Sequence, residues 1–145
     1  MLRQTDMRWR PILALMLCFA PAACGANSPD APPGIFFPTV PAQDAYPTAL
    51  MGGVLEVRSR CIFVDRWLLL WPEGYTARLA NGRLEVLDET RDVVAIESAQ
   101  IRVGGGETNP VEVGGADAAE RWATDLTGLN IPERCGDLYW IVSPN

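Results

Sequence analysis

The sequence predicts a mainly antiparallel, all-β domain over residues 51–145, closed into a small barrel. Apolar residues recur there in short runs of strand length, and glycine, proline or asparagine separates the runs. Asn81-Gly82 stands between two alternating runs and is typical of the tight turn of a β-hairpin. We expect five to seven short strands and one short helix.

The strands are expected in order along this part of the chain. The first is residues 53–64, in which Leu55, Val57, Cys61 and Phe63 share one face. The others are the solid apolar run at residues 66–72, the hairpin at 75–88, the runs at 92–96 and 101–103, and a last strand within 136–145. This spacing suits an OB-like barrel among up-and-down and Greek-key arrangements, with an open sandwich as the alternative.

Two features follow the run at residues 101–103. Gly104–Gly106 is expected to break the sheet as a bulge or tight turn, because a phosphate-binding loop would also need Gly-Lys-Ser/Thr. Asp117 and Glu120 have the spacing of a capping box, which predicts a helix near residues 117–126. Trp122 would lie on its apolar face.

The N-terminal segment has the order of a secretory signal peptide, which we assign to residues 1–23. Arginines precede an unbroken apolar run from Ile12 to Ala20, and small residues follow. The run is too short to cross a bilayer as a helix, which needs about 20 residues.

The residues Pro21-Ala22-Ala23-Cys24 resemble the lipobox of bacterial lipoproteins. The resemblance implies cleavage before Cys24 and a thioether-linked diacylglycerol on its sulfur. Pro21 departs from the leucine common in such boxes. The alternative is cleavage after Ala22, which would give a secreted or periplasmic soluble protein with a free thiol.

The cysteine count favours the lipid. Cys18 leaves with the apolar run, and a lipid on Cys24 leaves two thiols, Cys61 and Cys135, as an even pair for an oxidising compartment. A bridge between them would restrict the unfolded chain by roughly 4.5 kcal/mol on the loop-entropy estimate. Their wide spacing disfavours a redox-active pair.

Residues 24–50 are rich in proline and are expected to form an extended tether that could hold the domain up to roughly 80 Å from the membrane. Ile35, Phe36 and Phe37 are unusual in a solvated spacer. We expect these three side chains to dock on the domain.

Composition excludes several functions. The net charge is −6, and the chain has neither histidine nor lysine. The negative charge disfavours nucleic acid as a partner. The missing residue types exclude catalytic relays and metal sites that need imidazole, and Schiff bases that need lysine. We expect no cofactor, no metal and no catalytic residue.

Acidic residues at expected strand ends leave one catalytic alternative, a carboxylate-dependent hydrolase or a calcium-binding domain. They are Asp65, Glu73, Asp88, Glu89, Asp92 and Glu107. Large aromatic residues offer a second kind of site, a stacking surface for an oligosaccharide, although filling the core is the expected role. They are Trp67, Trp71, Tyr75, Trp122, Tyr139 and Trp140.

The order of Cys61, WPEG at 71–74, GRLEVLD at 82–88, GGG at 104–106 and PERC at 132–135 resembles a set of small bacterial envelope proteins. The resemblance implies a shape and a location but no reaction. The sequence thus predicts a membrane-anchored, exported lipoprotein whose β domain binds or scaffolds an envelope protein or an oligosaccharide.

Overall fold

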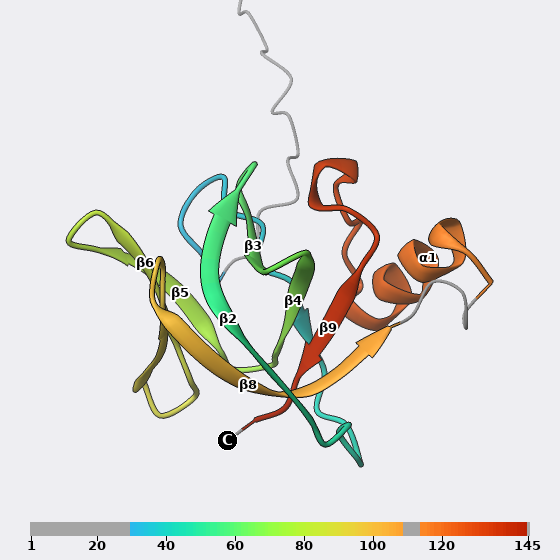
Figure 1. The fold of residues 1–145 in the computed structure, drawn as a ribbon, viewed down its shortest axis with the longest axis horizontal. Helices are drawn as coiled ribbons and strands as arrows, with labels where there is room; N and C mark the ends of the chain where they lie inside the picture. Colours follow the sequence, from blue (N-terminus) through green and yellow to red (C-terminus); the bar gives the residue numbers. More distant parts are fainter. Residues whose placement is uncertain (1–29, 109–113, 145) are drawn as a thin grey trace, which may run out of the picture.

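The structure, a computed structural model that describes residues 30–108 and 114–144, contains a closed barrel of five strands. Around the ring each strand pairs with the next, and β4–β9 is the parallel pair while the other four pairs are antiparallel (Figure 1). In ring order the strands are β2 (Ala49–Arg58), β3 (Cys61–Val64), β4 (Trp67–Pro72), β9 (Tyr139–Val142) and β8 (Gln100–Thr108).

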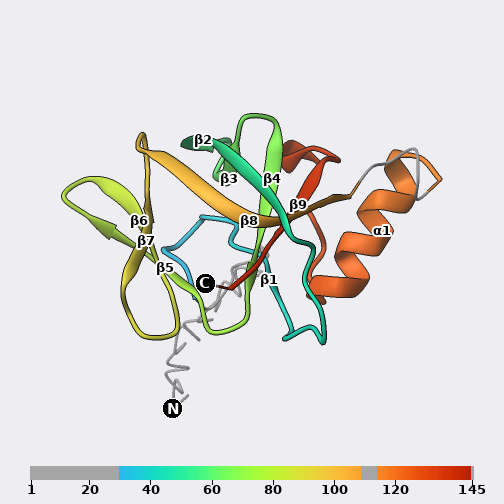
Figure 2. The same cartoon turned by 60° about the horizontal axis from the view of Figure 1, so that its bottom comes forward.

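A second, three-stranded sheet is inserted between β4 and β8 and stands at one end of the molecule (Figure 2). It consists of β5 (Thr76–Ala80), β6 (Arg83–Leu87) and β7 (Val93–Ile96). Asn81 and Gly82 join β5 to β6 with φ angles of 52° and 74°, the positive values that a two-residue hairpin requires. The predicted hairpin is confirmed.

The predicted fold class, a small all-β barrel with one short helix, is also confirmed. Five is the strand number of an OB-like barrel. The described residues hold nine strands, because the inserted sheet and the two-residue β1 add to the barrel. The helix lies between β8 and β9.

Residues 53–64 were predicted to form a single strand, but the structure divides them between two strands, β2 and β3. Ser59 and Arg60 turn the chain between β2 and β3 with φ angles of 49° and 65°. Neither residue is the glycine or asparagine that usually marks such a turn, and the alternating pattern continues on both sides of it. The sequence pattern therefore hides the turn.

Gly104–Gly106 was predicted to break the sheet, but all three residues lie inside β8. Gly105 has a φ of 143°, and a Cβ atom built on it would lie 1.8 Å from the carbonyl oxygen of Ile141. A Cβ on Gly106 would lie 2.3 Å from Cβ of Pro47. Glycine is needed here because other backbone and side chains approach the strand closely.

Helix α1 (Ala116–Thr127) matches the predicted helix, but its predicted capping box is wrong. The N-cap is Gly115, which provides no side-chain hydrogen bond, and Asp117 lies in the first turn instead. The helix ends at Gly128, whose left-handed backbone lets its N–H donate to the carbonyl of Thr124.

The folded unit includes residues 36–40 of the segment predicted as a tether (24–50), and residues 24–29 of that segment lie outside the described residues. Phe36 and Phe37 are 1% and 0% exposed, so their predicted docking on the domain is confirmed. β1 (Thr39–Val40) also pairs in parallel with β4. Proline-rich segments favour extended backbone, and the same extended backbone suits pairing at a strand edge.

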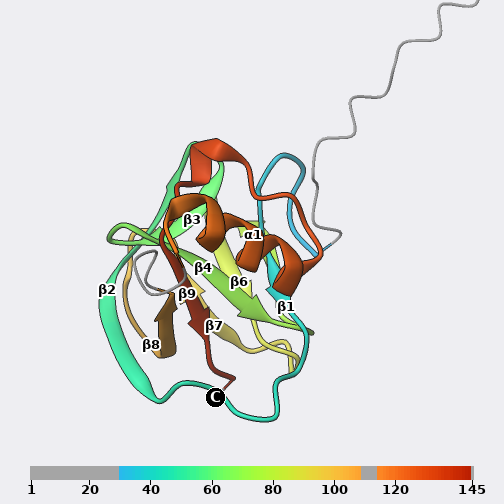
Figure 3. The ribbon, with the colours of Figure 1, turned by 90° about the vertical axis from the view of Figure 1, so that its right-hand side faces the viewer.

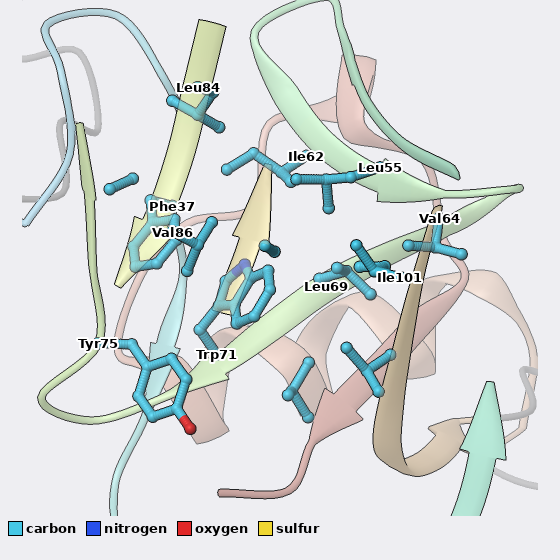
Figure 4. Packing of buried hydrophobic residues seen from close by; sticks show 14 of the residues in the cluster. Phe37, Leu55, Ile62, Val64, Leu69, Trp71, Tyr75, Leu84, Val86 and Ile101 are labelled. Atoms are coloured by element: carbon cyan, nitrogen blue, oxygen red, sulfur yellow. The ribbon is translucent and has the colours of Figure 1, made fainter. Parts of the chain in front are cut away.

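Two hydrophobic clusters stabilise the domain. The inner cluster fills the barrel and the space under the inserted sheet, and Figure 4 shows Phe37, Trp71 and Tyr75 within it. The outer cluster lies between the barrel wall and α1, which covers one side of the barrel in Figure 3. Ala119 and Ala123 of α1 are fully buried in that outer cluster.

Candidate functional site

The six aromatic residues predicted as core or stacking surface are divided between the two clusters. Trp71, Tyr75, Tyr139 and Trp140 are buried, while Trp67 and Trp122 are partly exposed. Trp71 lies between the rings of Phe37 and Tyr75, with centroid distances of 5.8 and 6.0 Å. The rings therefore fill the core, as expected, and they do not form one exposed stacking face.

The ligand face of an OB-like barrel is also covered. In such barrels the second and third strands and nearby loops bind oligonucleotides or oligosaccharides. Here those strands are β3 and β4, and their outward side chains Phe63, Leu68 and Leu70 are buried in the outer cluster with Ala119 and Ala123. Helix α1 thus covers the face that OB-like barrels use for their ligands.

The disulfide between Cys61 and Cys135 lies in the outer cluster, on the side of the barrel that α1 covers. Their Cα atoms are 5.6 Å apart, and both residues are fully buried in the outer cluster. The bond joins the start of β3 to the short 3-10 helix Glu133–Cys135 that precedes β9. Nε of Arg134 also donates to the carbonyl oxygen of Ser59, 2.9 Å away. The pair is a structural crosslink, and Cys24 lies outside the described residues.

Among the acidic residues singled out in the sequence, Asp88 and Asp92 lie together in one exposed turn. Oδ1 of Asp88 accepts hydrogen bonds from the Thr90 hydroxyl (2.7 Å), the Thr90 N–H (2.9 Å) and the Asp92 N–H (3.0 Å). The Thr90 hydroxyl is the main reason that the pKa of Asp88 lies below its ordinary value. These bonds hold the β6–β7 turn in place.

Glu89 is exposed in the same turn, between Asp88 and Asp92, while Asp65, Glu73 and Glu107 are exposed at other positions in the chain. Within residues 30–108 and 114–144, no three His, Cys, Asp or Glu side chains come together as a metal site requires. Among the described residues, the acidic side chains therefore form no cluster of the kind that would hold a calcium ion.

A groove of about 650 Å³ runs along the outer edge of β5, and we take it as the candidate binding site among the described residues. Its floor and walls combine apolar side chains, backbone and two arginines. The lining residues are Asp30, Ala31, Pro32, Pro33, Thr76, Ala77, Arg78, Leu79, Leu87 and Arg91.

The hydrogen bonds of β5 show which backbone groups face the groove. The Ala77 N–H donates to the carbonyl oxygen of Asp30, 2.7 Å away, so Ala77 points its backbone outward from the sheet. Backbone direction alternates along a strand, so Leu79 points its N–H and carbonyl to the same side. No described residue pairs with Leu79 on that side, and its side chain is 62% exposed.

The wall opposite β5 is shaped by a tight turn. The Ile35 N–H donates to the carbonyl oxygen of Pro32 (3.0 Å), and Gly34 has a φ of 81°, as in a type II turn with Pro33 at its second position. The rim also carries Arg78, whose guanidinium pairs with Glu85 at 2.7 Å. An exposed strand edge beside a groove of mixed apolar and polar lining is suited to an extended polypeptide.

None of the groove residues was predicted as a site residue. The Pro33-Gly34 dipeptide could have indicated a turn, but residues 30–33 were assigned to the tether. Which strand lies beside that turn depends on tertiary packing, and no local pattern records it.

The fold and groove define a small, disulfide-closed β-barrel domain with an open strand edge. Comparison of the chain with protein families, characterised proteins and solved structures finds no match. Over the part of the chain that the structure describes, no helix is long and apolar enough to span a bilayer.

Proposed function

We propose that this protein is an exported, lipid-anchored envelope protein whose barrel domain binds an extended polypeptide segment of another envelope protein. The observation that carries the binding proposal is the outer edge of β5, where Leu79 presents backbone and an exposed side chain to the groove. A polypeptide strand can pair with such an edge, and adjacent side-chain contacts then give specificity.

Export and anchoring are supported by the N-terminal segment together with the disulfide. Stable disulfides belong to oxidising compartments outside the cytosol. The disulfide uses Cys61 and Cys135, so Cys24 is the one other cysteine of the sequence beyond the apolar run. A lipid on its sulfur would account for it, as the lipobox-like sequence and the resemblance to small envelope proteins suggest.

A polypeptide is a better-supported partner than the other classes considered. Oligosaccharides are commonly bound by exposed aromatic rings, and four of the six candidate rings are buried. A net charge of −6 disfavours nucleic acid.

The anchor can be tested by fractionating cells that express the full chain with a single cysteine changed. Cys24→Ser should move the protein from the membrane to the soluble fraction, because its lipid is lost. Cys18→Ser is the matched control and should leave the protein on the membrane. Membrane retention of the Cys24 variant would contradict the anchor.

The groove can be tested by photo-crosslinking in living cells, with the reactive amino acid at position 79 or at position 50. Leu50 on β2 is a matched control, because it is 67% exposed and lies away from the groove. We expect a discrete adduct of higher mass from position 79 alone. The same adducts from both positions, or an internal crosslink without added mass, would argue against a partner in the groove.

A further inference from the structure

The lipid-anchored cysteine and the first described residue of the domain are close together in the chain. Six residue steps separate Cys24 from Asp30. A fully extended chain covers at most about 3.5 Å per residue, so the Cα atoms of Cys24 and Asp30 can lie no more than about 21 Å apart. The tether expected over residues 24–50 does not extend through residues 36–40, because these residues belong to the fold.

Asp30 is itself fixed to the groove. Its carbonyl oxygen accepts the Ala77 N–H at 2.7 Å, and Asp30 lines the groove beside β5. The first described residue after Cys24 is therefore part of the proposed binding site.

From these two facts we infer that the groove is held at the membrane surface and binds a polypeptide segment lying against that same membrane. The inference rests on the proposed lipid at Cys24 and adds the position of the site and the class of its partner. The partner is a protein embedded in, or attached to, the membrane that holds the anchor, because segments held at that same surface have a high effective concentration at the groove.

The shape of the molecule indicates which end of the domain faces the bilayer. The β5–β6 hairpin and α1 stand at opposite ends of the long axis of the molecule (Figure 1). A short connection at β5 therefore keeps the groove near the bilayer and α1 away from it. Charge contributes little to the orientation, because Arg91 at the groove adjoins the acidic residues Asp88 and Asp92.

The experiment compares the depth of two labels in full-length protein purified from membranes and reconstituted into phosphatidylcholine vesicles. With Cys24 acylated and the disulfide closed, Leu79→Cys or Asp125→Cys provides one free thiol for a fluorophore. Asp125 is an exposed residue of α1. A small fraction of lipids carries a quencher on the headgroup, and mass spectrometry establishes the acylation of each sample.

We expect several-fold stronger quenching at position 79 than at position 125. A flexible Gly-Ser insertion between Gly25 and Ala26 should remove most of the difference and weaken the crosslink from position 79 in cells. Equal quenching at positions 79 and 125 in acylated protein would overturn this inference, and so would a difference that the insertion leaves unchanged. Neither result would contradict the proposed anchor. A Cys24 without lipid would overturn the proposed anchor and, with it, this inference.

Discussion

Phe37 stacks on Trp71, with ring centroids 5.8 Å apart and ring planes within 12° of parallel. Phe37 comes from the proline-rich segment, and Trp71 comes from a central strand of the barrel. Both side chains are almost fully buried in the inner cluster. The contact makes the segment before β2 a part of the hydrophobic core.

We therefore predict that Phe37→Ala destabilises the domain as a core substitution would. Removing a large buried aromatic ring costs about 3–5 kcal/mol of unfolding free energy. Asp44→Ala is the control, because Asp44 is exposed in the same part of the chain and should change stability by less than about 0.5 kcal/mol. Urea unfolding of both variants measures the difference, and equal stability would show that the segment is not part of the core.

Adjacent glycines of β8 are predicted to differ sharply in their tolerance of a side chain. A Cβ at position 105 would lie 1.8 Å from the Ile141 carbonyl oxygen, whereas one at position 104 would lie 3.6 Å from its nearest neighbour, Ser143. Gly105→Ala should therefore prevent folding or cost more than about 3 kcal/mol, and Gly104→Ala should cost less than about 1 kcal/mol. Thermal melts of the two variants make the comparison, and similar melts would contradict the close approach of β8 and β9.

The disulfide is predicted to supply a large share of the stability. Replacing Cys61 and Cys135 together by alanine should lower the unfolding free energy by about 2–5 kcal/mol. Arg134→Ala is the control, because it removes a neighbouring exposed hydrogen bond but leaves the crosslink in place. Denaturant titration under non-reducing conditions tests this, and a double variant as stable as the parent would rule out the structural role.

Tyr139 is predicted to make stability depend on pH in the alkaline range. Burial, with Glu120 and Asp137 nearby, raises the pKa of this phenol from 10.0 to about 12. Between these values the folded state keeps the proton that the unfolded chain releases, so the unfolding free energy should fall as the pH rises.

The control for this effect is Tyr139→Phe. This variant loses the hydrogen bond from the hydroxyl to the Gly136 carbonyl, which costs about 1 kcal/mol at neutral pH. It should also lose the part of the alkaline decline that Tyr139 causes. Identical declines in the two proteins, measured by denaturant titration from pH 9 to 12, would assign the effect to other groups.

Local patterns predicted the elements whose signals lie in consecutive residues. Asn81-Gly82 marks its hairpin because those residue types tolerate positive φ, and the apolar run 67–72 marks a buried strand. Ser59-Arg60 makes an equivalent turn with residues that rarely do so. Such a turn is imposed by the pairing of β2 with β3 and cannot be read from composition.

The groove depends even more on tertiary structure. Asp30 and Ala77 are far apart in the sequence, and their hydrogen bond exists only once the proline-rich segment has packed on the barrel. The same proline content suits a solvated spacer and a segment docked at a strand edge. What separates the two is the burial of Phe36 and Phe37, which the sequence indicated only as a docking expectation.

The central claim, an exported domain held by a lipid on Cys24, is tested most directly by the intact mass of the protein extracted from membranes without reductant. The account predicts the mass of residues 24–145 with acyl groups on Cys24 and with Cys61 and Cys135 oxidised. The mass of the full chain of residues 1–145, with unmodified cysteines, would contradict it.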